Sequence, residues 1–147
     1  MASCQMIDML KRGEQFHHLL ADYYENMENH VGREDVKMVL DYMRRHEEFL
    51  AQCFRDYEEQ APRGITQAWF KVRPDDHLLE LLESVEIRPD VSVDEVVRQA
   101  MRFDEALIGL YRQLSEVAVS EQLREALEKI LLLELQEEKK LTQQFQY

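Results

Sequence analysis

Cysteine, glycine and proline are all scarce in this 147-residue chain, which contains two cysteines, four glycines and three prolines. The two cysteines, Cys4 and Cys53, form no CxxC pair, which excludes a rubredoxin-type iron centre and a zinc ribbon. Scarce glycine and proline, together with abundant leucine, glutamate, glutamine, methionine and arginine, favour helix. We therefore expect an all-α protein.

Basic patches and long apolar runs are also missing. The net charge is −12 and no basic stripe is visible, so a nucleic-acid partner is not expected. The longest apolar run, "ILLL", is far too short to span a membrane, and the N-terminal segment lacks the apolar core of a signal peptide. No nucleophilic triad, phosphate loop or nucleotide fingerprint is present. These absences predict a soluble cytoplasmic protein with no membrane partner.

Four long helical patterns fill most of the chain. Ser3, Ser92 and Ser120 are suitable N-caps, and "SVDE" from Ser92 to Glu95 is a capping box. The first expected helix runs from a cap at Ser3 to about Asn29, and the second opens with "GRED" and lasts to about Gln60. The third runs from Ser92 to about Val117, and the fourth from Ser120 almost to the C-terminus. The intervening segment, about 61–91, holds all three prolines and one short helical stretch, "DDHLLELLESV". Short connections join the first two helices and the last two, which predicts two antiparallel hairpins joined by a long crossover within one domain, 1–147.

Each long helix carries an apolar seam with steps of three and four residues, and each seam is interrupted near its middle by a polar residue. "RFDEALIGLY" shows the pattern, because its seam places an aspartate among apolar neighbours. The interrupting residues are His17, Glu47, Asp104, Glu134 and Glu137. Trp69 and Phe70, in the crossover, are expected to dock it on the bundle.

The two halves of the chain also align at one ungapped offset of 87 residues. His17 then falls on Asp104, Glu47 on Glu134, and Leu50 on Glu137. One offset that relates both hairpins indicates an internal duplication. In such a bundle the polar seam residues lie at similar heights and face one another.

Several carboxylates in a dry core repel one another unless they are protonated, solvated or neutralised by a cation. Oxygen ligands with one imidazole suit iron or manganese and, less specifically, zinc. The motifs "FHHLLADYY", "RRHEEFL", "FDEALIGLY" and "ELQEE" resemble the ferritin-like superfamily, on its rubrerythrin-like side. That family places one glutamate on each of two helices and a Glu-x-x-His pair on each of the other two.

By this resemblance Glu47 and Glu134 are the bridging carboxylates of a metal site. His17 and Asp104 stand at the glutamate positions of the first and third helices. Glu137 stands at one histidine position, and Leu50, at the other, cannot bind a metal. Neither Glu-x-x-His motif is intact, so the resemblance implies an incomplete di-metal site, and a single-metal or vestigial site stays open.

The resemblance implies a non-haem metal-binding protein that uses iron or manganese, with possible redox chemistry on oxygen or peroxide. It would then be a non-haem iron oxidoreductase, and electrons would come from a separate donor protein because the chain has no CxxC-bound iron. The alternative is a metal-free ferritin-like scaffold that acts through protein–protein association, most simply as a homodimer.

Other arrangements of the site stay open at this point. His46 could face the core in place of Glu47, as part of a damaged Glu-x-x-His with Met43. Glu105 could be the inward residue beside Asp104, and Glu14, one turn before His17, could supply a missing carboxylate. The glutamates could also simply flank their seams, as charged residues of bundle helices often do.

Overall fold

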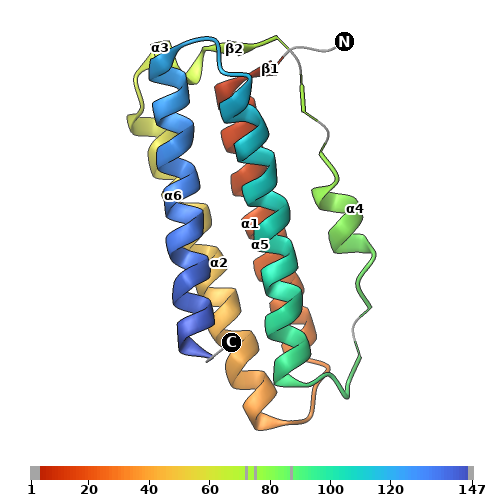
Figure 1. Cartoon of the computed structure of the whole chain (residues 1–147). Helices are drawn as coiled ribbons and strands as arrows, with labels where there is room; N and C mark the ends of the chain where they lie inside the picture. Colours follow the sequence, from red (N-terminus) through yellow and green to blue (C-terminus); the bar gives the residue numbers. More distant parts are fainter. Residues whose placement is uncertain (1–3, 72, 75, 87, 146–147) are drawn as a thin grey trace.

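A computed structural model of the chain describes residues 4–71, 73–74, 76–86 and 88–145. Four long helices run side by side: α1 (Met6–Glu28), α2 (Glu34–Gln60), α5 (Val93–Glu116) and α6 (Glu121–Gln144). Figure 1 shows them as two hairpins, α1 with α2 and α5 with α6, joined by a crossover that runs the length of the bundle on its outside. The predicted all-α bundle of two hairpins is therefore confirmed.

The helix starts show how local sequence sets these boundaries. The Ser92 hydroxyl accepts from the backbone N–H of Glu95 at 3.1 Å, and the Ser120 hydroxyl accepts from that of Leu123 at 3.2 Å, as the cap positions predict. The first helix differs, because it begins after Gln5, whose backbone N–H donates to the Asp8 carboxylate at 2.9 Å. The predicted cap at residue 3 lies outside the described residues.

The crossover contains α3 (Arg63–Thr66), a two-residue strand β2 (Trp69–Phe70) and α4 (Leu78–Glu83). Strand β2 pairs antiparallel with β1 (Cys4–Gln5), so the start of the crossover is fastened to the N-terminal end of α1. The sequence did not predict these strands, since two residues carry no readable periodicity. Phe70 is fully buried and docks the crossover as expected, whereas Trp69 is 57% exposed.

The rest of the crossover returns along the outside of α5, and α4 lies beside that helix (Figure 1). An ion pair between the Arg12 guanidinium and the Asp76 carboxylate, 2.5 Å apart, ties the crossover to α1. The segment then reaches the opposite end of the bundle, where α5 begins. A pocket lies between the last crossover residues and the first turns of α5.

The core forms where the four seams meet. The five polar residues predicted to interrupt the seams are all buried, and so are apolar residues of each long helix such as Leu20, Leu50, Leu107 and Leu127. Phe16 of α1 and Phe103 of α5 meet edge to face, with ring centroids 6.3 Å apart, which links the two hairpins. Over the described residues, no helix is both long and apolar enough to cross a membrane.

Candidate metal centre

The polar centre of the bundle is built around His17. Its Nδ1 lies 2.5 Å from a carboxylate oxygen of Glu47 on α2, and its Nε2 lies 2.8 Å from a carboxylate oxygen of Glu134 on α6. All three side chains are buried, with at most 3% of each residue exposed. The imidazole of α1 therefore bridges two carboxylates from two other helices.

This geometry favours the charged form of His17. An ionised carboxylate can only accept hydrogen bonds, so both ring nitrogens must donate, and the ring that does this is an imidazolium. Burial alone would lower the pKa of His17, but the carboxylates of Glu134 and Glu47 outweigh it and raise that pKa well above its usual range. The imidazolium thus supplies positive charge inside an acidic core.

Asp104 is the contribution of α5 to the same region, and it is 5% exposed. Burial raises its pKa well above the usual range, and the charges of Glu47 and Glu134 raise it further, against a lowering effect of His17. Asp104 therefore keeps its proton to a higher pH than an exposed aspartate does. The predicted repulsion among seam carboxylates is relieved in two ways, by the imidazolium of His17 and by a proton on Asp104.

Tyr24 adds a hydroxyl that stands apart from these pairings. The residue is fully buried, and its hydroxyl has no hydrogen-bond partner among the described residues. Burial raises the pKa of Tyr24 well above its usual range, and the nearby charges of Glu47 and Asp104 add to the rise. An unpartnered buried hydroxyl costs free energy, about 1–3 kcal/mol, unless a further group accepts or donates there. It is therefore an unsatisfied polar atom that lies close to the two acids.

Packing around His17 holds its ring in place. Phe54 of α2 meets the imidazole edge to face, with ring centroids 5.2 Å apart. Phe54 can approach so closely because Gly13 faces it, since a Cβ at Gly13 would lie 2.3 Å from both the Phe54 ring and the Tyr111 hydroxyl. That hydroxyl in turn donates to the backbone carbonyl of Met9 at 3.1 Å. A glycine in the middle of α1 thus makes room for the aromatic wall of the centre.

Glu137, the fifth predicted site residue, is buried but contacts a different set of groups. One of its carboxylate oxygens accepts from the Lys140 ammonium at 2.9 Å, and the other lies 3.4 Å from Nδ1 of His46. The His46 ring stacks on Tyr42, with centroids 6.2 Å apart. The structure therefore brings His17, Glu47, Asp104 and Glu134 together and turns Glu137 toward α2.

The burial and the contacts of individual side chains decide between the alternatives that the sequence left open. Glu47, not His46, is the α2 side chain that contacts His17. Asp104 is buried while Glu105 is exposed. The carboxylate of Glu14 lies 3.5 Å from His18 and 3.3 Å from Arg55, on the outer side of the α1–α2 hairpin, so it does not supply the missing acid.

The donor set of this centre, three carboxyl groups and an imidazole near an unpartnered hydroxyl, is of the chemical kind that a hard cation prefers. It does not fit two metal ions. Leu50, fully buried at one expected histidine position, offers no donor, and Glu137 at the other is engaged elsewhere. Over the described residues, no three or more His, Cys, Asp or Glu side chains already stand as a metal-binding group. The imidazole ring keeps Glu47 and Glu134 apart.

Comparison with known proteins agrees with the architecture. No protein-family model and no curated protein matches the chain. Among solved structures, the chain is similar to a Thermotoga maritima protein described as a ferritin-like diiron-carboxylate protein, with a TM-score of 0.60 and 20% sequence identity. The match covers 97% of this chain and 95% of that one. The chain therefore has the ferritin-like fold that its seams and crossover predicted.

Proposed function

We propose that this chain is a non-haem metal-binding protein of the ferritin-like fold, and that it holds one iron or manganese ion at the centre of the bundle. Glu47, Glu134 and Asp104 would supply oxygen ligands, and His17 the imidazole. The observation that carries the proposal is the convergence of these four buried side chains from all four long helices. A likeness in fold to a protein described as diiron-carboxylate supports it.

Charge balance explains how the same residues can be stable with and without the ion. In the structure, the imidazolium of His17 and the proton favoured on Asp104 offset the acids of the centre. A divalent cation brings two positive charges, and the release of these two protons leaves the net charge of the centre unchanged. His17 would give up one of its two glutamate contacts to use a ring nitrogen as a ligand.

The bound ion would supply redox chemistry with oxygen or peroxide, since an ion held by few protein ligands keeps open positions. The residues around it would hold and shield it. Phe54, which packs against the His17 ring, excludes water from that side, and the Tyr24 hydroxyl supplies a proton donor beside Glu47 and Asp104. We propose that electrons come from a separate donor protein, because no CxxC pair lies in the sequence.

The test is a calorimetric titration of the EDTA-treated and then desalted chain with Mn²⁺, repeated in buffers of different ionisation enthalpy. One site that releases protons, with an affinity that rises with pH, is the expected result. Asp104→Asn removes one releasable proton and one ligand, so it should weaken binding and lower the number of protons released. Binding that is independent of pH and unchanged in Asp104→Asn would contradict the proposal.

Glu137 is the remaining predicted ligand, and it can be tested separately. It would have to leave His46 and Lys140 to reach the ion. If Glu137→Gln binds Mn²⁺ as tightly as the unaltered chain, the site uses the other four residues alone. A large loss of affinity would add Glu137 to the ligands.

A second candidate function is the metal-free scaffold, and the contacts of His17 favour it. The imidazolium already satisfies both glutamates, and Leu50 fills a ligand position with an apolar side chain. Such a bundle would work by association, and we propose a homodimer through exposed apolar side chains of α2 such as Met38 and Phe49, which are 73% and 52% exposed. Sedimentation equilibrium tests this, because Phe49→Glu should yield monomer if that face is the interface. A monomeric unaltered chain would refute the dimer.

A further inference from the structure

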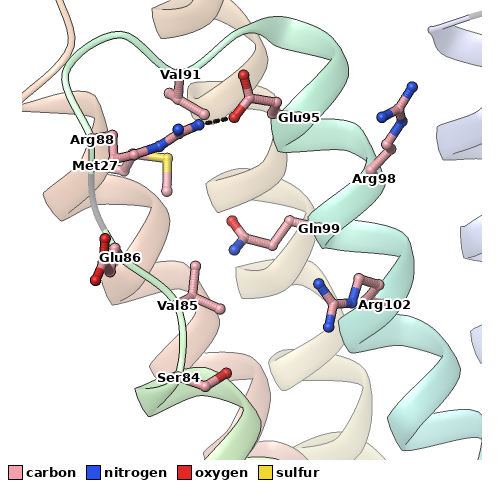
Figure 2. A pocket seen from close by; sticks show the side chains of 10 residues that line it. All are labelled: Met27, Ser84, Val85, Glu86, Arg88, Val91, Glu95, Arg98, Gln99 and Arg102. Atoms are coloured by element: carbon pink, nitrogen blue, oxygen red, sulfur yellow. Dashed lines mark hydrogen bonds and ion pairs between the residues drawn. The ribbon is translucent and has the colours of Figure 1, made fainter.

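A pocket lies at the end of the bundle where the crossover meets α5, away from the polar centre. Its volume is about 540 Å³, within the range of roughly 300–1,000 Å³ that small-molecule sites occupy. Met27, Val85 and Val91 give it apolar walls. Figure 2 shows the crossover on one side and α5 on the other, with side chains of both reaching into the space between them.

The polar lining of the pocket is unusually basic for a chain with a net charge of −12. Three arginines line it: Arg88 from the crossover, and Arg98 and Arg102 from α5. Arg88 is paired with Glu95, and Arg98 lies 2.8 Å from Asp94 with its guanidinium turned toward the outer side of α5 in Figure 2. Arg102 differs from both, because no ion pair or hydrogen bond joins it to another described residue.

Gln99 lies one turn before Arg102 on the same face of α5, and both side chains reach toward the crossover (Figure 2). The Tyr23 hydroxyl donates to the side-chain carbonyl of Gln99 at 2.8 Å. Burial raises the pKa of Tyr23 to about 12, which keeps that hydroxyl a donor. The contact fixes the carboxamide, and its N–H groups, which have no acceptor among the described residues, remain to donate alongside the guanidinium.

Taken together, these features describe an anion site with an apolar wall. We propose that the pocket binds a small organic anion, a carboxylate or phosphate monoester with a short apolar body, whose charged head is held by Arg102 and Gln99. The apolar body would lie against Met27, Val85 and Val91. A planar guanidinium beside a fixed amide matches the geometry of such a head.

The acids of the lining set the strength and selectivity of the site. Glu95 is neutralised by Arg88 and also accepts from the Ser92 hydroxyl at 3.2 Å. Glu86, an exposed crossover residue, adds a negative charge at the rim. We therefore expect a carboxylate head, with one negative charge, to bind more tightly than a phosphate monoester, which carries nearly two, and removal of the Glu86 charge should tighten the binding of both.

The experiment is calorimetric titration of the whole chain in EDTA with three probes: hexanoate, hexyl phosphate and, as a neutral control, hexanol. At least one anionic probe should bind at one site per chain, and hexanol should bind at least about tenfold more weakly. A comparison of hexanoate with hexyl phosphate identifies the preferred head. EDTA keeps the result independent of the metal proposed for the centre.

Matched variants locate the binding. Arg102→Gln should weaken the anionic probe by about tenfold or more, and Gln99→Leu should weaken it as well. Arg124→Gln makes the same charge change on α6, where Arg124 is 2.7 Å from Glu121 and outside the pocket, so it should leave affinity unchanged. Glu86→Gln should strengthen binding a few-fold. A ¹³C-labelled methyl group of Met27 should shift on addition of the probe.

Three results would overturn the proposal. One is the failure of both anionic probes to bind in the millimolar range. Another is equal weakening by Arg102→Gln and Arg124→Gln, which would show only the effect of net charge. The third is hexanol binding as tightly as hexanoate, which would show an apolar cavity with no anion site.

Discussion

Replacement of His17 by leucine tests the central ion pairs most sharply. The substitution leaves Glu47 and Glu134 buried without the imidazolium that now contacts both, at 2.5 and 2.8 Å. Removal of one partner from a buried ion pair costs about 3–5 kcal/mol, because the remaining charge is left uncompensated. For a chain of this size that corresponds to a fall of roughly 6–20 °C in Tm.

The assay is urea unfolding in EDTA, followed by circular dichroism, with His18→Leu as the matched control. His18 is the next residue, but its side chain is 53% exposed and lies 3.5 Å from Glu14, so its loss should cost less than about 1 kcal/mol. A triple variant with leucine at His17, Glu47 and Glu134 should recover most of the lost stability, since apolar packing can replace a buried ion cluster.

The pH dependence follows from the direction of the pKa shift. The folded-state pKa of His17 is raised, so its stabilising contribution is fully present below the unfolded pKa of about 6.5. It is lost as the pH rises through the folded value, and the difference between the unaltered chain and His17→Leu should shrink there. Equal, small losses in His17→Leu and His18→Leu at pH 6 would refute the account of the centre.

Three further predictions concern other parts of the fold. Burial and the neighbouring glutamates raise the pKa of Asp104, so the chain should lose stability as the pH rises from about 4 toward that raised value. In urea unfolding, Asp104→Asn should make the free energy of unfolding less dependent on pH over that range. Gly13→Ala should cost about 1–3 kcal/mol because its Cβ would meet the Phe54 ring, whereas Gly109→Ala, with nothing within 4 Å, should stabilise by up to about 1 kcal/mol in thermal melts. Burial and the Glu14 carboxyl raise the pKa of Glu58 to about 7, so Glu58→Gln should stabilise the chain above pH 7, and an unchanged pH profile of unfolding would contradict this.

The fold could be predicted from the sequence because its main signals are local. Steps of three and four residues define each seam, and Ser92 and Ser120 mark two helix starts by their hydroxyls. The pairing of Cys4 with Phe70 could not be predicted, because it joins two very short segments that are distant in the chain. Such contacts depend on how the crossover docks, which no local pattern encodes.

The sequence predicts which residues of the site are buried, but it does not predict which partner each side chain contacts. The seam placed Glu134 and Glu137 on the same face of α6, and both are buried. Which of them reaches the centre is decided by partners on other elements, His17 for one and His46 for the other. The seams contain one histidine and several acidic residues. This imbalance was the signal in the sequence that the histidine itself could act as the counter-ion of the acids.

The basic pocket could not be predicted from the sequence. Arg98 and Arg102 have the spacing of ordinary surface residues on a helix, and their sequence context shows no ligand motif. They become part of a pocket only because the crossover returns along α5, held by the strand pair at one end and by the Arg12–Asp76 ion pair. The residues that shape the pocket are therefore distant in sequence from those that line it.

The measurement that tests the central claim most directly is metal content by plasma mass spectrometry, on protein purified without an affinity tag and again after anaerobic loading with ferrous iron. Glu134→Leu is the test variant, and Glu128→Leu, an exposed position on the same helix, is its control. The account predicts one equivalent of iron or manganese per chain, lost in Glu134→Leu and kept in Glu128→Leu. No stoichiometric metal under either condition, or equal metal in both variants, would contradict it.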